Sequence, residues 1–165
     1  LLGGGAFLSS RIPMRLRENE GMSYGAGTYM NSNYKYDVTN WGLYAIFNPL
    51  YKGRLDSAMH QEIDKAIAAG FTKDELTKSV SAWIEGNKTS LGMNDFLARQ
   101  LRWYIRDGRD LTDFTNFESR VKALTTDAVN AAMKKYFDKS KLVVVYGGEF
   151  DKTKPADKPA EKKGF

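Results

Sequence analysis

The stretch LGGGAFLSSRIPMRLRENEGMSYGAGTY, residues 2–29, decides how the chain folds. An apolar side chain recurs at every fourth position from Leu8 to Leu16, and this spacing predicts a helix over residues 6–20. Gly21 follows at once. Because glycine adopts positive φ without steric cost, Gly21 is expected to end the helix and to reverse the chain.

Pro13 restricts where this helix can begin. A proline is tolerated only in the first turn, because its missing N–H has no intrahelical partner there. Ser9 or Ser10 is therefore expected to cap a helix that starts just before Pro13.

The segment after Gly21 has the alternation of a β-strand. Bulky side chains share one parity between residues 22 and 30, and small residues share the other, namely Ser23, Gly25 and Gly27. A neighbouring backbone is expected to lie close to this small-residue face. Residues 31–33, which read Asn-Ser-Asn, predict a turn, and residues 34–48 predict a second strand that completes a β-hairpin.

Four or more helices are expected after the hairpin. The first ends at Gly70 and has an apolar stripe made of Leu55, Met59, Ile63, Ala66 and Ile67. Thr72 and Glu75 have the spacing of a capping box and predict the start of the second helix. Its apolar side is made of Leu76, Val80, Trp83 and Ile84.

Similar patterns predict the remaining elements. A helix over residues 94–107 is expected to turn four side chains inward, namely Leu97, Leu101, Tyr104 and Ile105. Residues 113–137 predict two short helices divided near Thr125 and Thr126. Residues 142–146 are apolar and rich in valine, which predicts a buried strand that returns to the sheet. This order predicts an α+β fold with two layers, in which helices pack on one face of a mostly antiparallel sheet.

The composition is that of one globular domain. The chain has 165 residues and a net charge of +5, and it has no apolar run near the roughly 18 residues that cross a bilayer. Residues 151–165 are rich in lysine and proline and are expected to form a flexible tail after a lobe over residues 1–150. The net charge does not indicate nucleic-acid binding. The absence of cysteine excludes disulfides, zinc ribbons and thiol catalysis.

The sequence contains no complete catalytic motif. His60 is the only histidine, so the chain cannot form a zinc site with two histidines, and we expect a solvated His60 without a catalytic role. Residues 86–89 read Gly-Asn-Lys-Thr but lie within a helical pattern, unlike a phosphate-binding loop. An arginine stripe could bind phosphates or an acidic partner, although aspartates nearby dilute its charge; it consists of Arg99, Arg102, Arg106 and Arg109.

The opening stretch resembles the C-terminal half of pitrilysin-like, or insulinase-like, zinc metallopeptidases. Members of that family show a glycine-rich lead, then Ser-Arg, then Leu-Arg-Glu-x-x-Gly followed by an apolar residue, any residue and a tyrosine. Ser10 and Arg11 followed by the run from Leu16 to Tyr24 keep this order. The resemblance covers about residues 1–150 and implies the family's half-lobe repeat, with its first strand and part of its first helix expected to be missing.

The resemblance also implies a function. Two homologous halves of such enzymes close around an unfolded peptide, so this chain would be the C-terminal lobe and inactive alone. That half supplies an arginine and a tyrosine seven residues apart, which correspond to Arg17 and Tyr24. Both are donors that can stabilise the oxyanion formed at a peptide carbonyl. The implied partners are a peptide substrate and the N-terminal half that binds zinc, in the same protein or as a partner subunit. A periplasmic or otherwise exported location is expected on the same basis.

Two alternatives stay open from the sequence. The same repeat can serve as a non-catalytic scaffold or partner lobe, although the presence of both Arg17 and Tyr24 favours the catalytic interpretation. An unrelated basic binding module that uses the arginine stripe is an alternative of another class. Without the resemblance, Arg17 would be interpreted as a cation at a helix end and Tyr24 as a half-buried strand residue.

Overall fold

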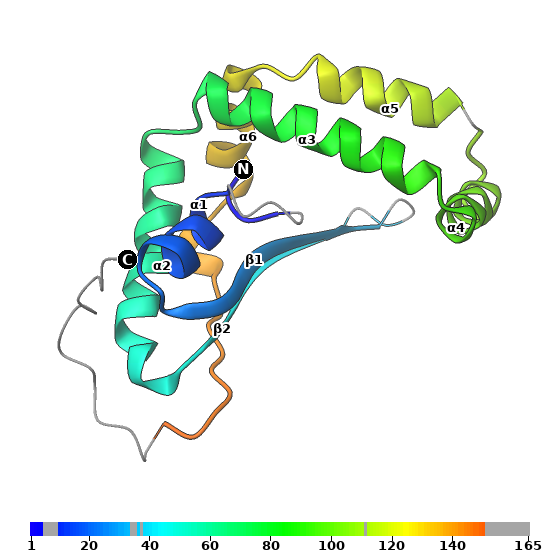
Figure 1. Cartoon of the computed structure of the whole chain (residues 1–165). Coiled ribbons are helices and arrows are strands. Elements are labelled where there is room, and N and C mark those ends of the chain that lie inside the picture. The colour runs from blue at the N-terminus through cyan, green and yellow to red at the C-terminus, as the bar shows by residue number, and fades with distance from the viewer. Residues whose placement is uncertain (5–9, 34–35, 37, 111, 151–165) are drawn as a thin grey trace, which may run out of the picture. The chain divides into compact units, whose positions relative to one another are not determined.

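The computed structural model describes residues 1–4, 10–33, 36, 38–110 and 112–150 (Figure 1). These residues form two compact units. Unit 1 consists of the described residues of Leu1–Met30, Trp41–Gly70 and Ala132–Phe165, and unit 2 consists of those of Asn31–Asn40 and Phe71–Ala131. The tail predicted over residues 151–165 lies outside the described residues.

The first helical element of unit 1 has two parts. A short helix α1 (Arg11–Pro13) runs directly into a π-helical segment η1 (Met14–Asn19). Pro13 lies in the first turn, as predicted, and Ser10 occupies the N-cap position with an extended backbone. The Ser10 side chain makes no capping hydrogen bond, so the predicted cap is confirmed in position only. The predicted helical start at residue 6 lies outside the described residues. Ile12 and Leu16 are both 0% exposed, so the predicted apolar side of this element belongs to the core.

Gly21 ends this element and reverses the chain, as predicted. Its φ is +59°, in the left-handed region that favours glycine. Two backbone hydrogen bonds close the turn: the Glu20 N–H donates to the Arg15 carbonyl at 3.0 Å, and the Met22 N–H donates to the Leu16 carbonyl at 2.8 Å. These bonds satisfy carbonyl groups that the end of a helix otherwise leaves open.

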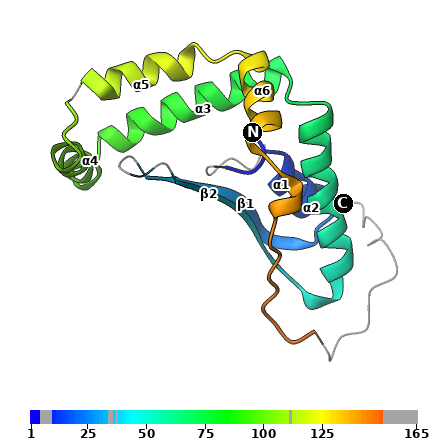
Figure 2. The ribbon, with the colours of Figure 1, turned by 180° about the vertical axis from the view of Figure 1, so that it is seen from behind.

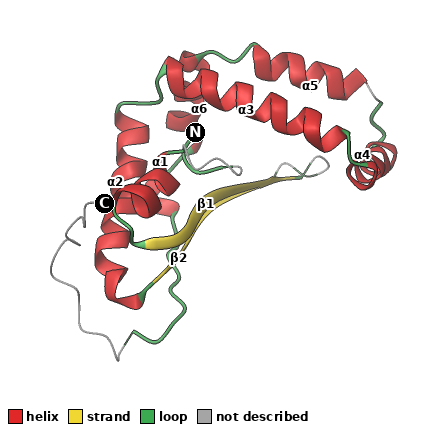
Figure 3. Cartoon of the chain, in the orientation of Figure 1, coloured by secondary structure: helices red, strands yellow, loops and turns green. Residues whose placement is uncertain are grey.

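The β-hairpin is confirmed, with different limits. Strand β1 (Ser23–Ser32) pairs with β2 (Thr39–Phe47), and these are the two strands found among the described residues (Figure 3). The predicted turn at residues 31–33 is wrong, since β1 continues to Ser32, and β2 begins at Thr39 rather than at residue 34. Turn propensity is a local preference, and pairing with a neighbouring strand overrides it at the end of a hairpin.

The small-residue face of β1 contacts a neighbouring backbone, as predicted. The Thr28 N–H donates to the Gly3 carbonyl at 2.6 Å. A Cβ atom added at Gly27 would lie 3.0 Å from the same carbonyl oxygen, closer than side chains normally approach. Glycine at position 27 therefore allows residues 1–4 to lie against the sheet.

Helix α2 (Lys52–Ala68) forms the second side of the core in unit 1. It follows a short 3₁₀ helix, η2 (Pro49–Tyr51), and Gly70 after it has a φ of +72°. Both α1 and η1 pack on α2. Its buried face contains four of the five residues of the predicted stripe, since Ile67 is only half-buried. The face also contains one carboxylate, and it consists of Leu55, Ala58, Met59, Glu62, Ile63 and Ala66.

Unit 2 is helical, and most of its predicted boundaries are confirmed. Helix α3 (Lys73–Leu91) begins with the complete Thr72–Glu75 capping box. Helices α4 (Asn94–Arg106) and α5 (Thr112–Lys122) follow, and α6 (Thr126–Tyr136) continues into unit 1. The Thr125 hydroxyl accepts a hydrogen bond from the Ala128 N–H at 3.2 Å, so the predicted division near Thr125 is confirmed.

The predicted inward face of α4 is wrong. Leu97 and Leu101 are 40% and 37% exposed, Ile105 is 80% exposed, and Tyr104 is half-buried. Helical spacing shows which side chains share a face, but it does not show whether another element covers that face.

The predicted strand at residues 142–146 is also wrong. These residues form no strand, and Val143 and Val145 are 86% and 84% exposed. The segment follows a short 3₁₀ helix, η3 (Lys139–Lys141), and runs along α2 (Figure 2). An apolar, β-branched run has the propensity for a strand, but a strand also needs a partner for its backbone hydrogen bonds.

The predicted α+β fold class is confirmed. Within the residues that the structure describes, no helix is both long and apolar enough to cross a membrane.

We expect Gly21→Ala to lower the free energy of unfolding by about 1–2 kcal/mol, because an alanine pays this steric cost in the left-handed region. Denaturant unfolding measures the change. Gly53→Ala is the matched control, since Gly53 lies in α2 with open space around it and lacks a positive φ. Equal stability of the two variants would contradict the positive-φ turn.

Candidate functional site

Arg17 lies on η1 and extends its side chain toward solvent. The side chain is 49% exposed, and its Nε atom lies 3.5 Å from Glu18 Oε1. An exposed ion pair of this length contributes little. The residue before it, Leu16, is fully buried. The backbone at Arg17 is therefore anchored, while its guanidinium is available to an external acceptor.

Tyr24 is the second residue of β1 and is 85% exposed. Its neighbours Met22 and Ser23 are only 2% and 7% exposed. The Ser23 hydroxyl lies 2.9 Å from the Ile46 carbonyl of β2 and 2.8 Å from the Gly25 carbonyl, so it can donate to either. Tyr24 thus projects from a part of the strand that is held firmly, and it is not the half-buried residue that an ordinary strand position would provide.

The structure places Arg17 and Tyr24 on the two elements that the Gly21 reversal joins, both in unit 1. The segment that carries Arg17 is π-helical. This geometry is rare in proteins, and where it occurs it is often found at functional sites. Each residue combines a buried immediate neighbour with an exposed polar end. This arrangement suits contact with a molecule outside the chain.

A cluster of charged side chains joins η1 to α2, and the sequence analysis missed it; it consists of Arg15, Glu20, Glu62 and Lys65. Arg15 Nη1 donates to Glu62 Oε1 at 2.8 Å, and Arg15 Nε donates to Glu20 Oε1 at 2.8 Å. Lys65 Nζ also donates to Glu62 Oε1, at 2.9 Å. Burial by itself raises the pKa of Glu62, but the hydrogen bonds from Lys65 and Arg15 outweigh burial and hold that pKa below its usual value. Glu62 is therefore a charged carboxylate in the core.

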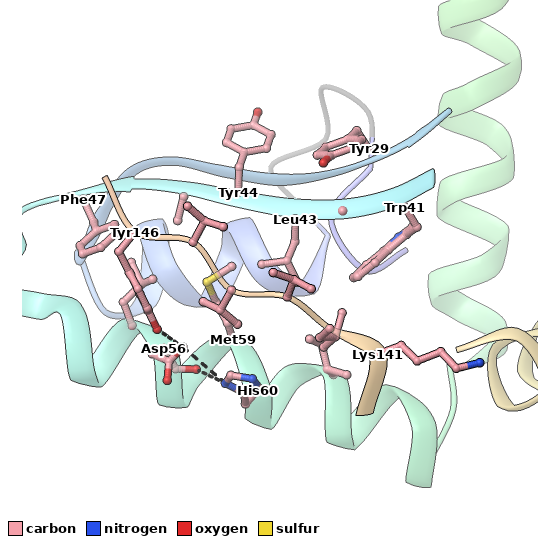
Figure 4. A pocket seen from close by; sticks show the side chains of 18 residues that line it. Tyr29, Trp41, Leu43, Tyr44, Phe47, Asp56, Met59, His60, Lys141 and Tyr146 are labelled. Carbon is pink, nitrogen blue, oxygen red and sulfur yellow. Dashed lines mark hydrogen bonds and ion pairs between the residues drawn. The ribbon is translucent and has the colours of Figure 1, made fainter. Parts of the chain in front are cut away.

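A second feature that the sequence analysis missed is a cavity within unit 1, of about 370 Å³ (Figure 4). Its walls come from β2, α2 and residues 141–146, and they are mainly apolar. Asp56 joins two of its polar side chains: the Tyr146 hydroxyl donates to Asp56 Oδ1 at 2.7 Å, and His60 Nδ1 lies 3.0 Å from the Asp56 carbonyl oxygen.

His60 is therefore half-buried beside this cavity, and the prediction of a solvated histidine is wrong. A carbonyl oxygen only accepts, so Nδ1 of His60 carries the hydrogen in this contact. The spacing of four between Asp56 and His60 could have suggested their contact on a helix. Tyr146 is ninety residues away in sequence, and no local pattern links it to them.

Residues 1–82 match the family described as the peptidase M16 inactive domain. The chain belongs to this family. Membership confirms the resemblance to the inactive C-terminal lobe of pitrilysin-like zinc metallopeptidases. A comparison with curated proteins gives no significant match.

Solved structures similar to this M16 inactive domain show the same fold. A peptidase M16 inactive domain from Pseudomonas fluorescens has a TM-score of 0.69 at 20% identity, over 83% of this chain and 32% of that one. The periplasmic protease PqqL from Escherichia coli has a TM-score of 0.60 at 18% identity, over 76% and 14%. A Bordetella pertussis protein assigned as a zinc protease has a TM-score of 0.61 at 16% identity, over 84% and 74%. The chain thus spans about a third of the Pseudomonas structure.

The described part of this M16 inactive domain offers no metal centre. Among those residues, no three His, Cys, Asp or Glu side chains lie together as possible ligands. The described residues therefore do not fit a catalytic zinc ion.

The arginine stripe of this M16 inactive domain is largely neutralised. Three of its four members form ion pairs with aspartates: Arg99 with Asp95 at 2.8 Å, Arg106 with Asp107 at 2.7 Å, and Arg109 with Asp113 at 2.9 Å. Residues 86–89 lie inside α3, which confirms that they are not a phosphate-binding loop.

We expect one tyrosine of the chain to titrate late. The hydrogen bond to Asp56, helped by burial, raises the pKa of Tyr146 to about 12. The stability from this bond is present below the ordinary tyrosine pKa of about 10 and is lost as the pH rises through about 12. Tyrosinate absorbance, compared between the protein and Tyr146→Phe, isolates this group. Asp56→Asn should lower the pKa of Tyr146 back toward the ordinary tyrosine value of about 10. If the absorbance difference between the protein and Tyr146→Phe is already centred near pH 10, the hydrogen bond to Asp56 is contradicted.

Proposed function

We propose that this chain is the lobe of a zinc metallopeptidase that helps to enclose the peptide substrate, with Arg17 and Tyr24 contacting that peptide. The observation that carries the proposal is the exposure of these two donors beside buried neighbours. Tyr24 is 85% exposed, and it follows Ser23, whose hydroxyl anchors β1 to β2. A phenol at so exposed a position contributes little to the core, so folding does not explain it. Membership of the M16 inactive-domain family supports the same role.

The two side chains suit two tasks in peptide hydrolysis. Attack on a peptide carbonyl places negative charge on its oxygen, and an O–H donor directed at that oxygen stabilises the transition state. We assign this task to the Tyr24 hydroxyl. The Arg17 guanidinium has several N–H donors in a planar fork, so it holds peptide carbonyls in the ground state as well.

The partner in this proposal is the N-terminal half, in the same protein or in another subunit, which would bind the zinc ion. That half would supply the metal and the attacking water, while this chain supplies the other wall of the substrate chamber. The Escherichia coli relative is a periplasmic protease, and we extend an exported location to this protein on that basis.

The alternative within the same fold is a non-catalytic scaffold lobe. It requires no exposed phenol or guanidinium at the Gly21 reversal, so the exposed Tyr24 favours the catalytic role. A basic binding module is disfavoured because most of the arginine stripe is already paired with aspartates.

Tyr24→Phe in the full-length protein should lower kcat by roughly 10²- to 10³-fold, which corresponds to the loss of one oxyanion donor. The ring remains, so the melting temperature should stay unchanged. The measurement is kcat and KM on a quenched peptide. Tyr136→Phe, at a tyrosine that is 76% exposed, is the matched control. Normal turnover in Tyr24→Phe, or a loss of turnover matched by a collapse of the melting temperature, would overturn the assignment.

Arg17→Ala should weaken substrate binding and turnover together, because a guanidinium holds the peptide before and during reaction. We expect kcat/KM to fall by at least roughly tenfold, with KM raised. Arg99→Ala is the matched control, since its side chain is 51% exposed, close to the 49% of Arg17. A kcat/KM of Arg17→Ala equal to that of the control would exclude substrate contact by Arg17.

A further inference from the structure

The cluster of charged side chains that joins η1 to α2 connects three parts of unit 1 through one side chain. Arg15 donates to Glu62 Oε1 of α2 at 2.8 Å and to Gln61 Oε1 of α2 at 2.6 Å. The same guanidinium donates to Glu20, the residue before the Gly21 reversal, at 2.8 Å. Arg15 therefore ties η1 both to α2 and to its own C-terminal end.

This arrangement fixes the rotation of η1 about its axis. Side chains two residues apart on a helix do not face the same way. Because Arg15 is held toward α2, Arg17 is directed elsewhere, and its side chain is 49% exposed where that of Arg15 is 21% exposed. A π-helical segment has less favourable packing of its own than an α-helix, so an external anchor matters more for its geometry.

Glu62 gives this anchor its strength. It is 7% exposed and accepts from both Arg15 and Lys65. If the buried carboxylate lost one of these cations, it would be left incompletely paired, which costs free energy. Arrangements of η1 that break the Arg15–Glu62 pair are therefore disfavoured. A weaker contact from α2 reaches the same Glu20, where Arg54 Nη2 lies 3.5 Å from Glu20 Oε2.

We propose that Arg15 and Glu62 act as a positioning pair that aims Arg17 at the peptide substrate. This inference rests on the proposed function, since it assumes that Arg17 contacts the substrate. Neither residue touches the peptide. Their effect passes through the orientation of η1, the segment that carries Arg17.

The test uses the full-length protein and a quenched peptide. Glu62→Gln should lower kcat/KM by roughly 10- to 100-fold, the effect of a displacement of about 1 Å in a substrate-binding group. The double variant Arg15→Met with Glu62→Leu removes both charges and should restore the melting temperature, because an apolar pair replaces the buried ion pair. The charges that lose a partner, Glu20 and Lys65, have side chains 27% and 62% exposed, so water can solvate them. Its kcat/KM should stay low. If kcat/KM recovers together with the melting temperature, the pair is structural only and the proposal is overturned.

A second comparison separates this proposal from the proposed function. In an Arg17→Ala background, Glu62→Gln should cause no further loss of kcat/KM, because the pair acts through Arg17. Additive losses would overturn the positioning role while leaving the function of Arg17 intact. If Arg17→Ala alone has normal kinetics, the proposed function itself fails. Asp74→Asn, which removes a carboxylate from an exposed ion pair with Lys78, is the control that should leave the kinetics unchanged.

Discussion

The packing of Ile12 and Leu16 against α2 is the constraint on which unit 1 depends. These two side chains lie one helical turn apart and are both fully buried, and α1 and η1 pack on α2. Burial of two such side chains contributes roughly 3–6 kcal/mol, a large part of the net stability of a small domain. Neither Pro13 nor the π-helical geometry interrupts this contact. The position of Arg17, the reversal at Gly21 and the start of β1 all follow from it.

Electrostatic interactions refine what apolar burial begins. Apolar packing is not directional, and it would allow η1 to rotate or slide on α2. The buried Arg15–Glu62 pair, at 2.8 Å, restricts that rotation because charge-assisted hydrogen bonds require a defined geometry. Most other ion pairs among the described residues join exposed side chains, for example Lys78 with Asp74, Lys88 with Glu85 and Arg99 with Asp95. Such surface pairs contribute little to stability. Within the described part of the chain, the contact of Arg15 with the buried Glu62 is therefore a charged contact that can fix the direction of a side chain.

Features with a local physical cause could be predicted from the sequence. The end of the first helical element at Gly21 follows from backbone sterics, and the start of α3 at Thr72 follows from hydrogen bonds within four residues. Whether Ile105, Val143 and Val145 are buried or exposed depends on whether an element distant in sequence covers them. Periodicity in the sequence carries no information about such an element. The position of His60 beside the cavity and the pairing of Arg15 with Glu62 also depend on elements distant in sequence, so they could not be predicted from local patterns. The resemblance identified Arg17 and Tyr24, but only the structure gave their exposure.

The spacing of seven residues between Arg17 and Tyr24 has a different meaning on each kind of backbone. On a continuous helix it would place them on one face, about 10 Å apart along the axis. On a continuous strand it would place them on opposite faces, about 23 Å apart. The reversal at Gly21 replaces both arrangements and lets each side chain take its direction from its own element. Arg17 depends on the anchor between η1 and α2, and Tyr24 depends on the anchor of Ser23 within the hairpin. The relative geometry of the two donors is thus set by two separate contacts, one accepted by the buried Glu62 and one donated by the buried Ser23.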